Sequence, residues 1–342
     1  MVMTRLADGP ATASVRLGSN TCVAQPQSSQ ESRAGIMSPA GCRWTALALI
    51  PAEGSPMNAG TIRLCIIVAG FMALTVSHAD SDIRTVASAD GVAVQYEMSG
   101  SGEPTLLLVH GWTNNRMFWE PHTTALAHSH RVVVMDLPGF GNSGINRESW
   151  TMESFGQDVA AVIRSLPDTK IVVVGFSMGG AAALEAAILV PDRMTGVILV
   201  DTLKDPNAKY SERSIQALMD RERSSWHDPS ALRADFSPGA PESLIQRYAD
   251  ATPASPPDHW WPIIADFLRW SGTRFPEMRD GLRVPVVAIN ADEPATDVAA
   301  WQQISPGFKL ATVKGVGHLG VIWEKTDEFD AQLLAFVEGF SH

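Results

Sequence analysis

The chain has 342 residues, with 37 Asp and Glu against 26 Lys and Arg, which gives a formal net charge of −11 at pH 7. An acidic chain is a poor partner for nucleic acid and for anionic membranes, since both are negatively charged. The cysteines are Cys22, Cys42 and Cys65, so the later part of the chain has no disulfide, thiol nucleophile or cysteine-ligated metal. We expect a small neutral or cationic molecule as the partner.

The N-terminal segment has two parts. Residues 1–56 are rich in Ser, Ala, Gly, Pro and Gln without a sustained apolar period, so we expect an unstructured or spuriously translated extension. Residues 57–79 start with Met57 and contain one positive charge, an apolar run at 64–76 and a small-x-small site ending at Ala79, which together predict a signal peptide. The run is shorter than the ~20 residues of a membrane-spanning helix. We therefore expect an exported protein, periplasmic or secreted, after cleavage near Ala79.

Three strands and a turn are predicted next. Residues 84–88 and 92–98 alternate apolar and polar side chains around an Asp-Gly pair, which predicts a hairpin. Residues 105–112 are typical of a buried strand that runs into a His-Gly-Trp sequence. Its histidine, His110, is either a base or, as we favour, a structural residue that holds the loop by hydrogen bonds.

Residues 131–136 predict a further strand, and a glycine-rich turn follows at 137–143. These glycines do not form a phosphate-binding loop, because no Lys-Ser/Thr follows them. Helical spacing at residues 152–165 then leads to the next strand.

A Gly-x-Ser-x-Gly motif at residues 175–179 is the strongest signal in the chain. Four consecutive β-branched residues precede it and an Ala-rich run follows, which predicts a buried strand, a tight turn and a closely packed helix. Larger residues two positions before and after the serine would collide with the strand or the helix. The turn lifts the Ser177 hydroxyl out of the sheet and points the Met178 backbone N–H at the same spot.

The remaining pattern is a strand, a helical segment and two more strands. Residues 196–201 are typical of a buried strand that ends in an acid. From 203 to 281 the sequence is helical and interrupted by prolines, and no strand is evident. Strands are predicted again at 284–290 and 308–314; the second runs into a Gly-x-Gly-His sequence ending at His318, and an amphipathic helix closes the chain.

These motifs together resemble the α/β-hydrolase family from about residue 84 to the C-terminus. The resemblance implies an α/β fold with a mostly parallel eight-stranded sheet flanked by helices, and a helical cap inserted between strands 6 and 7. Residues 80–202 and 282–342 are then the core and residues 203–281 the cap.

The resemblance also implies a site. In this family the chain order is nucleophile, acid, base, so Ser177 is the nucleophile and His318 the base that activates it. The backbone N–H groups of Trp112, which follows the His-Gly pair, and of Met178 would bind the oxyanion. Neither a metal ion nor an organic cofactor is implied.

The identity of the acid is open, because this sequence departs from the family pattern. The usual position, counted from the Val-Pro that opens the penultimate strand, holds Pro294. A second position, at the end of the strand after the nucleophile, holds Asp201. We favour Asp201 over Asp292, with Glu293 and Asp297 behind.

Tryptophan is concentrated in the cap. Trp260 and Trp261 either line an apolar substrate pocket beneath the cap or pack the cap onto the core. The two interpretations are equally supported by the sequence.

The sequence thus predicts an exported serine hydrolase that cleaves a small ester, lactone or related acyl substrate through a Ser-His-Asp triad and an acyl-enzyme. Carbon–carbon bond hydrolases and cofactor-free haloperoxidases of this fold keep the triad and are the enzyme alternatives. Epoxide hydrolases and haloalkane dehalogenases use an aspartate nucleophile, so Ser177 argues against both. A non-catalytic ligand-binding protein of the same fold is the remaining alternative.

Overall fold

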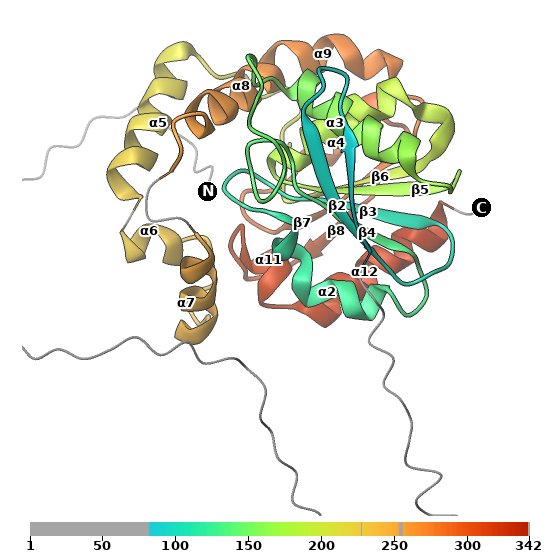
Figure 1. Ribbon diagram of the computed structural model, residues 1–342. Coiled ribbons are helices and arrows are strands. Elements are labelled where there is room, and N and C mark those ends of the chain that lie inside the picture. The colour runs from blue at the N-terminus through green and yellow to red at the C-terminus, as the bar shows by residue number, and fades with distance from the viewer. Residues whose placement is uncertain (1–81, 227, 253–255, 341–342) are drawn as a thin grey trace, which may run out of the picture. The chain divides into compact units, whose positions relative to one another are not determined.

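An eight-stranded sheet is the centre of the fold in the computed structural model (Figure 1), which describes residues 82–226, 228–252 and 256–340. The strand order is β1-β2-β4-β3-β5-β6-β7-β8. β2 is antiparallel to β1 and to β4, and all other neighbours are parallel. The expected architecture and its antiparallel edge are confirmed. The expected extension at 1–56 and the expected signal peptide at 57–79 lie outside the described residues.

The strands are β1 (Asp82–Ala87), β2 (Ala93–Ser99), β3 (Thr105–Val109), β4 (Val132–Met135), β5 (Ile171–Phe176), β6 (Met194–Val200), β7 (Val286–Ala291) and β8 (Leu310–Val313). The helices outside the expected cap are α2 (Glu120–Leu126), α3 (Met152–Ser165), α4 (Met178–Leu189), α10 (Val298–Ile304), α11 (Gly320–Trp323) and α12 (Thr326–Gly339), with 3-10 turns η1 (Arg116–Trp119) and η2 (Pro191–Arg193). In the part of the chain that the structure describes, no helix is both long and apolar enough to cross a membrane.

The core is divided by the sheet into two layers of side chains. Successive residues of a strand point to opposite faces, so Leu107 and Val173 pack with the residues of α3 and α4, whereas Leu106 and Val172 pack with those of α11 and α12. All four side chains are fully buried. The β-branched run of β5 is therefore covered on both faces, as its unbroken apolar sequence predicts.

Five helices and one short turn connect β6 to β7, where the cap is expected. They are α5 (Glu212–Ser225), α6 (Pro229–Arg233), α7 (Glu242–Ala251), α8 (Trp260–Gly272), α9 (Arg274–Met278) and η3 (Arg279–Gly281), and the described residues of this segment include no strand. In Figure 1, α8 and α9 lie on the same side of the sheet as α3 and α4. We call residues 203–281 the cap.

Polar side chains join the cap to the core layer. Glu185 of α4 is buried, and its carboxylate accepts Trp270 Nε1–H at 2.8 Å and Arg274 Nε–H at 3.0 Å. Asp266 of α8 accepts the Met152 N–H, at the first turn of α3, at 2.7 Å. Because a buried ion is strongly destabilising when it loses its partner, these contacts favour one position of α8 on the core.

We expect Asp266 to make the protein less stable as the pH rises. Burial raises its pKa to about 6, so the folded chain binds a proton more tightly than the unfolded chain. The resulting stabilisation is complete below about pH 4 and is lost as the pH rises through about 6. Asp266→Asn keeps an oxygen for the Met152 N–H but does not titrate. We therefore compare the free energy of unfolding of the variant with that of the wild type at about pH 4 and about pH 8. The difference, variant minus wild type, should be larger at the higher pH by about 1 kcal/mol, a value reduced to allow for the partial exposure of Asp266.

Urea unfolding at the two pH values measures this difference. Asp280→Asn serves as the control, because 93% of the Asp280 side chain is exposed. An Asp266→Asn effect that does not change with pH contradicts the prediction.

Candidate active site

Ser177 occupies a sharp turn between β5 and α4. Its backbone has φ 51° and ψ −123°, a conformation that residues with a side chain rarely adopt. A Cβ added at Gly175 would lie 2.5 Å from Gly179 O, and one added at Gly179 would lie 2.5 Å from His110 O. Glycine is therefore required at both positions, which is the crowding that the motif predicts.

Backbone hydrogen bonds fix this turn. The Ser177 N–H donates to Val200 O at 2.9 Å, and Ser177 O accepts the Gly180 N–H at 2.9 Å. α4 begins at Met178, whose N–H belongs to the first helical turn and has no partner within the helix. Ser177 is half-buried, whereas its neighbours Phe176 and Met178 are buried.

His318 lies in the loop between β8 and α11. Its ring packs against that of Phe176, the residue before Ser177, with centroids 4.6 Å apart. Nδ1 is 2.6 Å from Asp201 Oδ2. An Nδ1–H given to the carboxylate leaves the Nε2 lone pair to accept a proton. The described side chains of His318 and Ser177 are not hydrogen-bonded to each other, a contact that in many enzymes tightens only when substrate binds.

Asp201 follows β6 directly, and only 6% of its side chain is exposed. Its Oδ1 accepts the Ala291 N–H at 2.8 Å and pairs with Lys204 Nζ at 2.9 Å, while Oδ2 faces His318. Burial alone would raise the pKa of Asp201, but the hydrogen bonds and charges of His318 and Lys204 lower it below its usual value. Asp201 is therefore an anion at neutral pH.

The other acids considered from the sequence have different contacts. Asp292 accepts the Gly315 N–H at 2.9 Å, Asp297 accepts a backbone N–H at the start of α10, and Glu293 is exposed. The structure thus brings the acid after β6, and none of these three, to His318. Among the described residues, no group of three or more His, Cys, Asp or Glu side chains could hold a metal ion.

The loop after β3 carries Trp112 past the serine. A Cβ added at Gly111 would lie 3.0 Å from Ser177 Cβ, so the loop and the turn are in close contact. Asn114 Nδ2 donates to Trp112 O at 3.1 Å, and Tyr248 Oη donates to Asn114 Oδ1 at 2.7 Å. Burial raises the pKa of the Tyr248 phenol, so it remains a donor. Ser177 is therefore flanked by the Trp112 loop and by Met178, the first residue of α4. These are the two segments that carry the oxyanion donors expected from the sequence.

His110 is a structural residue in this loop. It is fully buried, its Nδ1 lies 2.7 Å from Gly111 O, and its Nε2 accepts the Leu137 N–H at 3.0 Å. Since Nε2 accepts, the ring is neutral with its proton on Nδ1. Burial lowers the pKa of His110, which also favours the neutral ring. The favoured sequence interpretation agrees with this arrangement.

Trp260 and Trp261 begin α8, and both are buried. Trp260 Nε1 donates to Gly139 O at 2.8 Å, and its ring packs against Phe140 with centroids 5.0 Å apart. The Trp261 ring lies edge-on to that of Trp112 at 5.6 Å. These contacts pack the cap onto the core, and a substrate-binding role for Trp260 and Trp261 remains a prediction.

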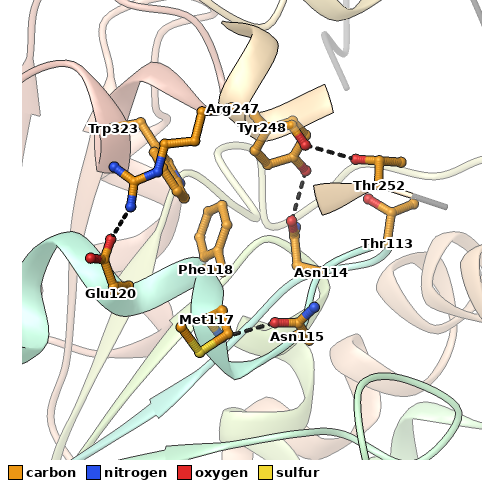
Figure 2. Close-up of a pocket in the computed structure, with 10 residues that line it drawn as sticks. All are labelled: Thr113, Asn114, Asn115, Met117, Phe118, Glu120, Arg247, Tyr248, Thr252 and Trp323. Atoms are coloured by element: carbon orange, nitrogen blue, oxygen red, sulfur yellow. Dashed lines mark hydrogen bonds and ion pairs between the residues drawn. The ribbon is translucent and has the colours of Figure 1, made fainter. Parts of the chain in front are cut away.

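A cavity of about 260 Å³ lies against the Trp112 loop (Figure 2). Its lining comes from that loop, from η1 and α2, from α7 and from α11, and includes Thr113, Phe118 and Trp323. The Phe118 ring packs against Phe176 at 4.6 Å, and Phe176 packs against His318. The cavity therefore lies beside the loop and is connected to the histidine by two aromatic rings.

Three residues of this site were not identified from the sequence. Lys204, three positions after Asp201, has a signal only in that spacing. Asn114 and Tyr248 leave no signal in the sequence, because they are 134 residues apart and meet through a single hydrogen bond.

We expect Gly179→Ala to destabilise the protein by about 2 kcal/mol or more, because its Cβ would meet the His110 carbonyl oxygen at 2.5 Å. Urea unfolding measures the effect. Gly307→Ala is the matched control: a Cβ at Gly307 has no atom within 4 Å, so its effect should stay within about 0.5 kcal/mol. Equal effects of the two substitutions would contradict this account of the turn.

Comparison with known proteins agrees with this architecture. A family model described as alpha/beta hydrolase fold matches residues 104–225. A thermophilic esterase from Thermogutta terrifontis has a similar solved structure, with a TM-score of 0.61 and 23% sequence identity over 75% of this chain and 99% of that one. A structural likeness at this identity shows the fold alone.

Two curated relatives match a shorter stretch of the chain. The pimeloyl-[acyl-carrier protein] methyl ester esterase of Aeromonas hydrophila is 37% identical over 110 residues, which are 32% of this chain and 41% of that protein. The dihydrolipoyllysine-residue acetyltransferase component of the acetoin cleaving system of Cupriavidus necator is 32% identical over 139 residues, or 40% of this chain and 37% of that protein. The match thus spans about two fifths of these relatives.

Proposed function

We propose that this chain, which has the α/β-hydrolase fold, is a serine hydrolase of that family and cleaves a small ester, lactone or related acyl substrate. The observation that carries the proposal is the 2.6 Å contact between His318 Nδ1 and Asp201 Oδ2, beside a strained Ser177 turn. A buried carboxylate on Nδ1 leaves Nε2 free to act as the base. The name of a similar methyl ester esterase supports an ester as substrate.

In the first half of the reaction, Ser177 Oγ bonds to the carbonyl carbon as His318 Nε2 takes its proton. Asp201 stabilises the imidazolium that results. The oxyanion is bound by the backbone N–H groups of Trp112 and Met178. Collapse of the tetrahedral intermediate expels the alcohol, which takes the proton from His318, and leaves an acyl-serine.

In the second half, a water gives its proton to His318 and attacks the acyl carbon. The second tetrahedral intermediate then breaks its bond to Ser177 Oγ, which takes the proton back from His318, and the acid is released. Every step uses side chains and backbone groups of this chain, with water as the one co-reactant.

The expectation of a small substrate is supported by the cavity beside the Trp112 loop, whose lining includes neither Ser177 nor His318. The cavity measures about 260 Å³, just below the ~300–1,000 Å³ of typical small-molecule pockets. Apolar rings form part of its lining, which suits the carbon chain of an acyl or alcohol group.

We expect Ser177→Ala and Asp201→Asn each to lower kcat for p-nitrophenyl esters by about 10⁴-fold or more, because each removes a member of the triad. A fluorophosphonate probe should label the wild type and not Ser177→Ala. Initial rates over a panel of acyl lengths measure the effects.

Two controls make this test specific. Asp292→Asn removes the other candidate acid and should leave the rate within about threefold, because Asp292 bonds to the Gly315 backbone. Ser101→Ala changes an exposed serine and should have no effect. Turnover or labelling that persists without the Ser177 hydroxyl contradicts the proposal, and no turnover at all favours the ligand-binding alternative.

We also propose that the protein is exported, on the sequence pattern of residues 57–79 alone. In a bacterial host, the periplasmic fraction should then contain a chain whose N-terminal residue is Asp80. Sequencing of the N-terminus measures this. A chain that keeps residues 57–79 and stays with the cytosolic fraction contradicts export.

A further inference from the structure

Lys204 is buried beside the proposed triad acid, although lysine is seldom buried. Only 9% of its side chain is exposed, and Nζ lies 2.9 Å from Asp201 Oδ1, 3.1 Å from Ala291 O and 3.0 Å from Glu293 O. An ammonium has three N–H groups, so each has an acceptor here. A buried charge needs such pairing to persist, and Asp201 is the anion that pairs with it.

The turn between Asp201 and Lys204 is strained and held from outside. Asp201 has φ 45° and Leu203 has φ 47°, conformations that favour glycine. The Asp297 N–H donates to Lys204 O at 2.7 Å, and Trp301 Nε1 donates to Leu203 O at 2.7 Å. Surrounding contacts thus impose a backbone that directs the acid and the lysine to one place.

We propose that Lys204 is a positioning residue for the catalytic pair: it holds Asp201 Oδ1 so that Oδ2 faces His318, and its positive charge repels an imidazolium there. This inference rests on the proposed hydrolase function and adds a residue to the three of the triad. The carboxylate cannot rotate without losing the ammonium and the Ala291 N–H together.

The charge of Lys204 acts on His318 through the shared carboxylate. The ammonium and the imidazole bind opposite oxygens of one carboxylate, so the positive charge of Lys204 repels an imidazolium at His318. Removing the lysine charge therefore favours the imidazolium. Without the lysine charge, a higher pH would then be needed to remove the proton from His318 so that it can act as the base.

Other charged groups near His318 do not replace this effect. They are Asp235, whose carbonyl accepts the Leu319 N–H, Asp292 on the Gly315 N–H, Glu324 at the end of α11, and Arg247 over the Trp323 ring. Three of the four are acidic. Arg247 is 57% exposed and is paired with Glu120, so solvent and that carboxylate weaken its field.

The kinetic test compares the pH dependence of kcat/KM for wild type and Lys204→Met. The acid limb should move upward by about one pH unit, and the plateau at high pH should fall roughly tenfold because the carboxylate loses a charged hydrogen bond. Lys204→Arg keeps the charge and should leave the limb in place. Lys170→Met, at a lysine with 64% of its side chain exposed, should change neither.

A second measurement does not depend on turnover. In full-length Ser177→Ala, NMR titration of the imidazole signals, with His318 assigned through His318→Gln, gives the midpoint of that histidine directly. Adding Lys204→Met should raise the midpoint by about one unit. If Lys204→Met does not fold, Lys204→Gln removes the charge, keeps donors for the two carbonyls, and should give the same shift.

The outcomes separate the two proposals. A wild type without Ser177-dependent turnover overturns the hydrolase function, while the titration still decides the role of Lys204. A limb and a midpoint that move by less than about 0.2 unit in both neutral variants overturn the role of Lys204, whatever happens to stability. If the plateau of kcat/KM at high pH falls but the acid limb does not shift, Lys204 acts through packing alone, and its proposed role is overturned as well.

Discussion

The hydrogen bond between His318 and Asp201 depends on the parallel pairing of β6, β7 and β8. Parallel neighbours end at the same edge of a sheet, so side chains 117 residues apart in the chain meet there. The Asp201 N–H donates to Ile289 O, and its Oδ1 accepts the Ala291 N–H, so the acid is bound to β7 through backbone and side chain. A slip of one residue between these strands would break both contacts and turn the carboxylate to the other face. The buried strands that set the register therefore also set the site.

Backbone strain is concentrated at the same edge. Among the described residues, positive φ outside glycine occurs at Thr113, Ser177, Asp201 and Leu203, and each lies in the turn after β3, β5 or β6. Such conformations cost of order 1–3 kcal/mol each and persist where neighbouring contacts leave no alternative. Here those contacts include backbone hydrogen bonds across β5, β6 and β7. The core thus stabilises the turns that carry Ser177, Asp201 and the loop of Trp112.

The fold could be predicted largely from the sequence, and the site only in part. Strands that are buried on both faces are recognised in the sequence as unbroken apolar runs, and the crowded serine turn is recognised by the glycines on either side of Ser177. The acid could not be decided, because Asp201 and Asp292 both follow strands that end at the same edge, and the backbone groups that hold each one decide which reaches His318. Asn114 and Tyr248 could not be found at all, since one hydrogen bond between distant residues leaves no period or spacing.

The cap is joined to the core by two different kinds of contact. α8 is bound through nine buried residues, whereas α5 buries Ile215 alone among its described side chains, so apolar burial holds α8 far more firmly. α7 reaches the site through a polar chain from Tyr248 to Asn114 to Trp112 O. Removing the phenol would leave a buried amide oxygen unpaired, at a cost of about 1–3 kcal/mol, next to the loop that carries a proposed oxyanion donor. Sequence changes in α7 that alter the cavity therefore also act on the loop, so in the proposed hydrolase specificity and rate would not be independent.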